Sequence, residues 1–97
     1  GTSGVILALS DIQGNLRIIL GIDNKGIATL NFIDPGDIDR FVVYSAPKEV
    51  TPNKQSPGAI LIFDTKGRLR VGIGVLPDGK PDIRLLDEKG KIVFKAP

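Results

Sequence analysis

The feature that most constrains this chain is a turn-and-strand pattern that occurs twice, 53 residues apart. It begins at Asp11 as DIQGNLRI and at Asp64 as DTKGRLRV. The two halves align without a gap from Asp11 to Phe41 and from Asp64 to Phe94, with Asp, Gly, Leu, Arg and Phe at matched positions. A register held over this length indicates an internal duplication, so the fold must be one that two similar halves can build.

A shorter spacing lies inside each half. Asp34 follows Asp11 by 23 residues, and Asp87 follows Asp64 by the same number. Between Asp34 and Asp64 the spacing is 30 residues, and the additional residues fall in SAPKEVTPNKQSPG, residues 45–58. Pro, Ser and Lys dominate this segment, which predicts a long connecting loop.

The length of the chain is that of one domain with a modest core. We therefore predict a single β domain over residues 1–97, made of duplicated halves 5–44 and 59–96 that are joined by the loop 45–58. The opening segment, residues 1–4, has no Met and is expected to be a flexible leader of a processed chain.

Hydrophobicity alternates with a period of two in every unit, and the apolar positions are rich in β-branched residues. This combination is typical of half-buried strands, and no segment has a helical pattern of useful length. The pattern predicts one apolar face formed by Leu16, Ile18, Leu20 and Ile22 and by the matching Leu69, Val71, Ile73 and Val75. We expect eight strands at about residues 5–10, 15–23, 27–33, 38–44, 59–63, 68–76, 82–87 and 91–96.

Short turns separate these strands. In Asp-x-x-Gly the Asp side chain caps its own turn, and Gly takes the left-handed conformation that follows a type I turn. The copy at Asp34 continues with Pro35 and Gly36, which suits a type II turn. The tripeptides NKG at 24–26 and PDG at 77–79 are expected to close the alternate hairpins. A structural, turn-capping role is therefore assigned to Asp11, Gly14, Asp34, Asp64, Gly67, Asp87 and Gly90.

The second face of the predicted sheet is also partly apolar, and it carries two glycines in mid-strand. A mid-strand glycine marks a place where another group approaches closely. A small sheet with two apolar faces needs closure or a partner chain. The predicted fold is all-β, with about eight short antiparallel strands in two duplicated halves, as a small barrel or sandwich or completed by oligomerisation. A swapped-hairpin barrel is a second topology, suggested by PGDI at 35–38 ahead of FVV at 41–43.

The segments LRVGIGVLPDG (69–79) and IRLLDEKGK (83–91) resemble short β-repeats of phage tail and bacterial surface proteins. Those repeats share a D-x-x-G turn, a strand that starts with Leu or Val and then Arg, a Gly, a PDG-type turn and another strand. The first half of the chain departs from this pattern at DNKG (23–26) and at DPGD (34–37). The resemblance implies a structural or assembly role, usually as an oligomer.

Composition excludes several chemistries. The chain has no Cys and no His, so the thiolate nucleophile, the neutral-pH imidazole base and the commonest metal ligands are missing. No Trp and a single Tyr leave few platforms for stacking bases, and a net charge of +2 does not make nucleic acid an expected partner. No apolar run approaches the ~20 residues of a membrane span. No cofactor is predicted, and virion, bacterial surface and cytoplasm all suit a chain without Cys.

Two groups of charged residues are candidate sites. Oxygen ligands for Ca²⁺ could come from Asp34, Asp37 and Asp39, but the spacing is not that of an EF-hand, so no metal is predicted. A basic ladder for phosphates or acidic glycans, or else a solvated face that guards strand edges, could come from Arg17, Arg40 and Arg70. The second reading is favoured because acidic residues are interleaved.

The sequence thus predicts a non-catalytic structural or protein-interaction module in a homo-oligomer or a larger assembly, such as a tail, a fibre or a cell surface. One alternative is a ligand-binding β-domain that uses the loop 45–58. Another is a dimeric aspartic-type hydrolase that uses Asp64, although Lys66 stands where that enzyme class has Gly. The candidate interaction residues are Gly72, Gly74, Phe63, Leu86, Tyr44, Lys48 and Lys54.

Overall fold

The computed structural model describes residues 6–36, 38–45 and 57–96, and within them the chain is all-β, as predicted. No helix occurs in these residues. The eight strands lie within one or two residues of the predicted bounds: β1 (Ile6–Ser10), β2 (Leu16–Ile22), β3 (Ala28–Asp34), β4 (Ile38–Ser45), β5 (Gly58–Phe63), β6 (Leu69–Val75), β7 (Pro81–Leu86) and β8 (Ile92–Ala96).

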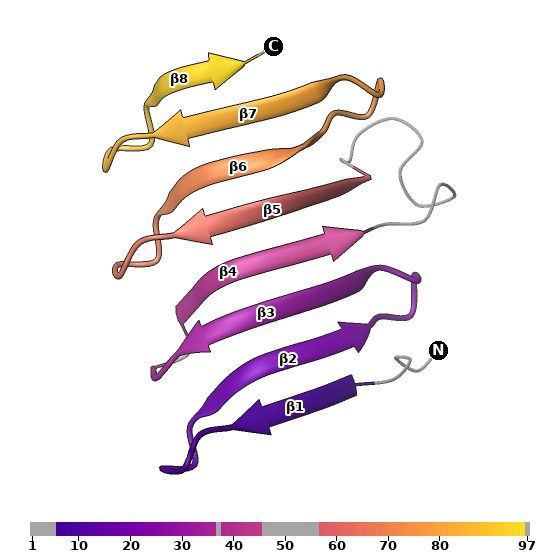
Figure 1. Cartoon of the computed structure of the whole chain (residues 1–97), viewed down its shortest axis with the longest axis vertical. Helices are drawn as coiled ribbons and strands as arrows, with labels where there is room; N and C mark the ends of the chain where they lie inside the picture. The colour runs from indigo at the N-terminus through magenta and orange to yellow at the C-terminus, as the bar shows by residue number, and fades with distance from the viewer. Residues whose placement is uncertain (1–5, 37, 46–56, 97) are drawn as a thin grey trace.

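The strands form one antiparallel sheet in which each strand pairs with its neighbours in sequence, in the order β1 to β8 (Figure 1). The two duplicated halves meet at the β4–β5 pair, where Val43 lies opposite Ile60. Residues 46–56, which connect these strands, lie outside the described part of the chain. The duplication therefore extends one sheet, and the described residues show no second layer.

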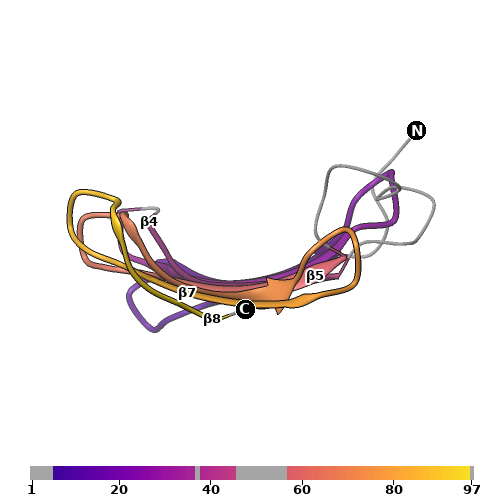
Figure 2. The same cartoon turned by 90° about the horizontal axis from the view of Figure 1, so that it is seen from above.

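The sheet is open. Strand β8 does not pair with β1, so the described chain does not close into a barrel. Its Cα atoms span 42 × 35 × 15 Å, and the sheet bows along the strand direction, which gives it a convex and a concave face (Figure 2). A single layer cannot bury a core, and Ile33 is the one buried large apolar residue among those described.

Most of the turns share one hydrogen-bonded form. At Asp11 the backbone N–H donates to the Asn15 carbonyl oxygen (2.9 Å), and Gly14 N–H donates to the Asp11 carbonyl oxygen (3.0 Å). The turns that begin at Asp23, Asp64, Leu76 and Asp87 repeat both bonds, and their glycines have positive φ. Gly36 also has positive φ (101°), as a type II turn requires.

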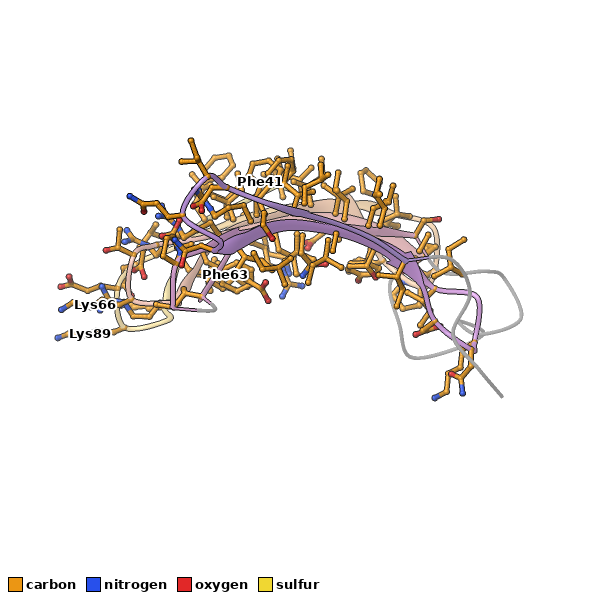
Figure 3. All side chains as sticks on the ribbon, turned by 90° about the horizontal axis from the view of Figure 1, so that it is seen from below. Phe41, Phe63, Lys66 and Lys89 are labelled. Atoms are coloured by element: carbon orange, nitrogen blue, oxygen red, sulfur yellow. The ribbon has the colours of Figure 1, made fainter. Side chains whose placement is uncertain are left out.

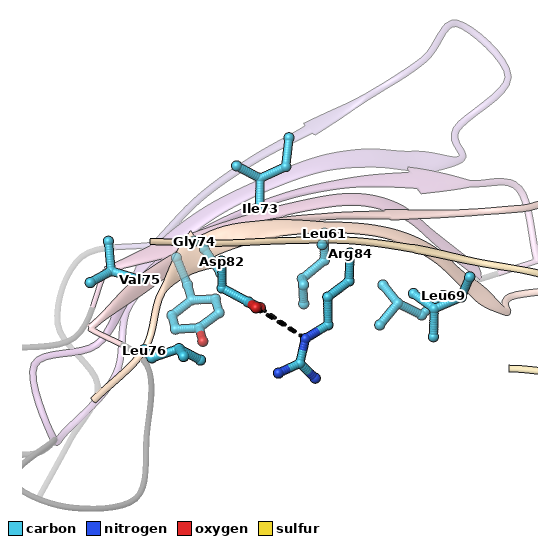
Figure 4. Close-up of a pocket in the computed structure, with 12 residues that line it drawn as sticks. Leu61, Leu69, Ile73, Gly74, Val75, Leu76, Asp82 and Arg84 are labelled. Carbon is cyan, nitrogen blue, oxygen red and sulfur yellow. Dashed lines mark hydrogen bonds and ion pairs between the residues drawn. The ribbon is translucent and has the colours of Figure 1, made fainter. Parts of the chain in front are cut away.

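Each of the four bulges next to the Asp turns contains one additional residue. The pairing skips Arg17, Arg40, Arg70 and Val93, which are equivalent positions in the four units. Because an additional residue reverses the alternation of side chains, Leu16 and Leu69 do not share the face of the residues that follow them. Leu69 lies on the concave face and Ile73 on the convex face (Figure 4). Leu69 pairs with Phe63, and Val71 lies two residues before Ile73 on the same face. The predicted face was wrong at these two leucines.

Candidate interaction surfaces

The convex face is almost entirely apolar. The pairing register places its side chains in rows that run across the strands, and Phe41 points outward on this face (Figure 3). The row nearest the Asp turns contains Leu9, Ile18, Phe32, Phe41, Ile62, Val71, Leu85 and Phe94. The central row contains Leu7, Leu20, Leu30, Val43, Ile60, Ile73, Ile83 and Ala96. The third row contains Ile22, Ala28, Ser45, Gly58, Val75 and Pro81.

These rows carry no charged residue, yet much of their surface meets solvent. Ten large apolar side chains on this face are exposed, from 38% for Leu85 to 53% for Leu7. Phe32 and Phe41 pack edge to face with ring centroids 5.9 Å apart, so they form a rigid aromatic centre in the row nearest the Asp turns. Exposed apolar patches above a few hundred Å² mark contact sites in folded proteins.

The concave face carries the polar side chains of the sheet. Here the bulge arginines Arg17, Arg40 and Arg70 form links between hairpins, which we call the arginine links. Their Nε atoms donate to the carbonyl oxygens of the adjacent strand at 2.7, 3.1 and 2.8 Å; the acceptors are Ile33, Phe63 and Leu86, respectively. A solvated outer face was favoured for these arginines; their side chains are 35–44% exposed, and each of them also has a backbone acceptor.

Each arginine link also reaches back to the aspartate of its own turn. Arg40 Nη1 lies 2.8 Å from Asp34 Oδ2, and the corresponding distances for Arg17 to Asp11 and for Arg70 to Asp64 are both 3.6 Å. A single guanidinium therefore ties one turn to the next hairpin. The planar, multi-donor geometry of Arg suits this double role better than the point charge of Lys.

The Asp64 carboxylate has several partners within its own turn. Its Oδ1 accepts the backbone N–H groups of Lys66 (2.9 Å) and Arg68 (3.0 Å), and its Oδ2 accepts Arg68 Nε (2.8 Å). The backbone hydrogen bond from Arg68 is the main cause that lowers the pKa of Asp64 to about 2. A general acid or base works best with a pKa near the working pH, so these contacts favour turn capping over the hydrolase alternative.

The other turn aspartates have similar contacts. Asp11 Oδ1 accepts the N–H groups of Gln13 and Asn15, and the bond from Asn15 lowers the pKa of Asp11. Asp87 Oδ1 accepts those of Lys89 and Lys91. Asp23, which the sequence reasoning did not assign, caps its turn in the same way through Lys25 and Ile27. Its signal was present, since DNKG is itself an Asp-x-x-Gly tetrapeptide.

The predicted acidic cluster does not gather a metal-binding group among the described residues. Asp34 pairs with Arg40, and Asp39 Oδ1 accepts a hydrogen bond from Asn31 Nδ2 at 3.3 Å. Asp37 lies outside the described residues. Both described carboxylates are therefore used within the sheet.

A hollow of about 250 Å³ lies on the concave face over β5 to β7 (Figure 4). Ala59, Gly72 and Gly74 lack large side chains, which leaves the space open, and Arg84 and Asp82 form an ion pair of 3.0 Å at its side. The hollow is shallow and mostly apolar. Its place in the fold is set by the small residues of β5 and β6.

The structure brings four of the predicted interaction residues to this hollow, namely Gly72, Gly74, Tyr44 and Leu86. Phe63 lies on the same concave face but does not line the hollow (Figure 3). Lys48 and Lys54 lie outside the described residues. The convex face, which the alternation marked as a core, was not predicted as a contact surface.

The close approach expected at the mid-strand glycines comes from the same sheet. A Cβ at position 74 would lie 2.6 Å from the Gly58 carbonyl oxygen and 2.9 Å from Ala59 Cβ, so only Gly fits there. A Cβ at position 72 would meet only Leu61 Cδ2, at 3.8 Å. Gly74 is thus required by the packing of β5 against β6, and Gly72 is not.

No protein-family model matches the sequence, and no curated protein matches it at a significant level. In the described part of the chain, no helix is long and apolar enough to cross a membrane.

Proposed function

We propose that this chain is a non-catalytic structural and interaction module whose convex face packs against the same face of a second copy. The observation that carries the proposal is the pair of complete apolar rows across all eight strands, which no part of the described chain covers. Burying apolar surface contributes roughly 25 cal/mol per Å², so a face of this composition gains free energy from a partner.

The size of the face suits a stable interface. The Cα extents of 42 × 35 Å correspond to an outline of about 1,470 Å², turns included. A standard interface takes roughly 800 Å² from each partner, so contact over about half of the outline is enough. Two sheets packed face to face lie ~10 Å apart and interdigitate side chains of the kind found in these rows.

The chemistry of the face favours a second copy over a different protein. A two-fold interface places one patch against itself, so every charge on the patch would need an opposite charge within the same patch. The convex face carries none. Because the sheet bows outward along its strands, the central row, which includes Leu20 and Ile73, stands furthest out and makes the first contact (Figure 2).

Light scattering coupled to size-exclusion chromatography tests this proposal. We expect a dimeric mass for the wild-type chain that persists on dilution, and a monomeric mass for the double variant Leu20→Lys/Ile73→Lys, whose dissociation constant should rise at least about 100-fold because two charges would be buried. Ile12→Lys is the matched control, since Ile12 is fully exposed in a turn, and it should stay dimeric.

Three outcomes would contradict the proposal. These are a monomeric wild-type chain at every concentration, a dimer that survives the double lysine substitution, and a loss of the dimer with Ile12→Lys alone. Circular dichroism of each variant checks that the strands are retained. The resemblance implies that the chain belongs to a tail, a fibre or a surface assembly. In that case the convex face should be buried in the assembled state.

A further inference from the structure

The arginine links give the sheet a direction. Each of them starts in one Asp unit and ends on the residue that precedes the aspartate of the next unit along the sheet: Arg17 on Ile33, Arg40 on Phe63 and Arg70 on Leu86. No link runs the opposite way in the described residues. In this series the first three units each donate to the next unit, and the last three units each accept from the preceding one.

The first acceptor of this series lies on the edge strand β1. Ser10 precedes Asp11 and pairs with Leu16 across a bulge, as Phe63 pairs with Leu69 across an equivalent one. The carbonyl group of Phe63 points away from the strand of its own hairpin, toward the arginine of the preceding unit. Because the register at Ser10 matches that at Phe63, we infer that the carbonyl group of Ser10 also points to the outer side of β1.

The two edges of the sheet differ in a second respect. Strand β1 reads ILALS, and it has no charge, Pro or Gly to discourage pairing; Ile6, Leu7 and Leu9 are 61%, 53% and 49% exposed. Strand β8 carries Lys95 and follows Lys91, which are residues that guard an edge. In β8 the position of the arginine link is occupied by Val93, which is 63% exposed.

We propose that the outer edge of β1 binds an antiparallel strand whose bulge carries an arginine, in a hairpin of the pattern Asp-x5-Arg followed by alternating apolar residues. The Nε–H group of this arginine donates a hydrogen bond to the Ser10 carbonyl oxygen. The strand extends the sheet by β-augmentation. A copy of this chain docked through β8 would place Val93 over Ser10 and leave that acceptor without the link. The favoured occupant is therefore an arginine-bearing unit.

The register of this complex follows from β2 and β3. There Ile18, which follows Arg17, lies opposite Phe32, and Leu20 lies opposite Leu30. On β1 the residue that directly follows the incoming arginine would lie opposite Leu9. The residue three positions after the arginine would lie opposite Leu7. Both rows of the convex face would then continue onto the partner strand. This edge is distinct from the surface used for dimerisation.

The probe is a fluorescent hairpin peptide with the sequence of residues 57–76, PGAILIFDTKGRLRVGIGVL, which contains Arg70. Its matched control carries Arg70→Val. The target is the full chain with Leu20→Lys/Ile73→Lys, so that the convex face does not contribute. We expect saturable binding of the probe by fluorescence anisotropy, and affinity at least 10-fold weaker for the control peptide, because it lacks a charge-assisted hydrogen bond.

Two further substitutions in the target locate the site. Ala8→Lys places a charge on β1 on the concave side and should weaken binding at least 10-fold, whereas Val93→Lys on the opposite edge should leave it unchanged. Equal affinity of the two peptides, absence of saturable binding, or a loss with Val93→Lys but not with Ala8→Lys would each overturn the proposal. A failure of the dimer leaves this experiment intact, because the target does not depend on dimerisation.

Discussion

The convex and concave faces of this sheet are built from the same eight strands and differ in what holds them in place. On the convex face, two complete rows of apolar side chains meet solvent, and the residues contact one another without a polar partner. On the concave face, the arginine links hold guanidinium groups against the carbonyl oxygens of the adjacent strand, and β6 packs closely against β5 at Gly74. The difference suggests that the concave face sets the register of the units and that the convex face supplies adhesion.

The largest expected effect on a single chain tests the close packing of the concave face. Gly74→Ala would place a methyl group 2.6 Å from a backbone oxygen, so β5 and β6 must separate, and we expect a loss of about 2–3 kcal/mol of unfolding free energy, as for overpacked sites. Urea denaturation, with and without Gly74→Ala in the Leu20→Lys/Ile73→Lys variant, measures this loss of unfolding free energy.

Gly72→Ala is the matched control, because Gly72 lies two residues before Gly74 on the same strand and the same face. Its methyl group meets only Leu61 at 3.8 Å, and removal of a flexible glycine from the unfolded chain should leave stability unchanged or raise it by up to ~1 kcal/mol. If both variants lose the same stability, general strand disruption would explain the result and the close approach at Gly74 would not.

A smaller effect tests the arginine links. Arg70→Val removes the donor to the Leu86 carbonyl oxygen, and we expect a loss of about 1–2 kcal/mol, typical of a hydrogen bond from a charged group. The reverse substitution, Val93→Arg, introduces an arginine at the equivalent position of the edge strand, where no other strand of the described residues offers an acceptor. It should change stability by less than ~0.5 kcal/mol, as expected of an exposed charge. Equal and opposite effects at the two positions would contradict the role of the acceptor.

The smallest effect concerns acid. Because folding lowers the pKa of Asp64 to about 2, its carboxylate stabilises the fold fully above the pKa of the unfolded chain, near 3.8, and this contribution is lost as the pH falls toward 2. Thermal unfolding of wild type and Asp64→Asn from pH 6 to pH 2 measures it. The difference in Tm should be largest at pH 6 and should shrink between pH 4 and pH 2. If the difference in Tm stays constant over this range, the ionised carboxylate of Asp64 does not contribute to stability.

Strands and turns could be predicted from the sequence because both depend on local patterns. Period-two alternation located all eight strands, and Asp-x-x-Gly located the turns at Asp11, Asp64 and Asp87. The faces of Leu16 and Leu69 were not predicted, because a bulge depends on pairing with another strand and leaves little local signal. An arginine six residues after three of the four unit aspartates was the one available signal.

The surfaces were harder to predict, because closure is a property of the whole sheet. Alternation shows that a face is apolar but does not show whether a second layer covers it. The residues predicted to form one apolar face, apart from Leu16 and Leu69, therefore became the exposed convex face. The mid-strand glycines were recognised as places of close approach. Whether the approaching group is a partner chain or the neighbouring strand, as at Gly74, could be decided only from three-dimensional positions.

The strictly sequential strand order has a thermodynamic consequence. Every strand contacts only the strands before and after it along the chain, so the sheet behaves as a one-dimensional array in which each pairing adds one neighbour contribution. In such an array the ends open at a lower free energy than the middle, and contacts between sequence neighbours form quickly. Cooperativity in this chain therefore comes from propagation along a line, with β4 and β5 at the centre, and does not require a shared interior.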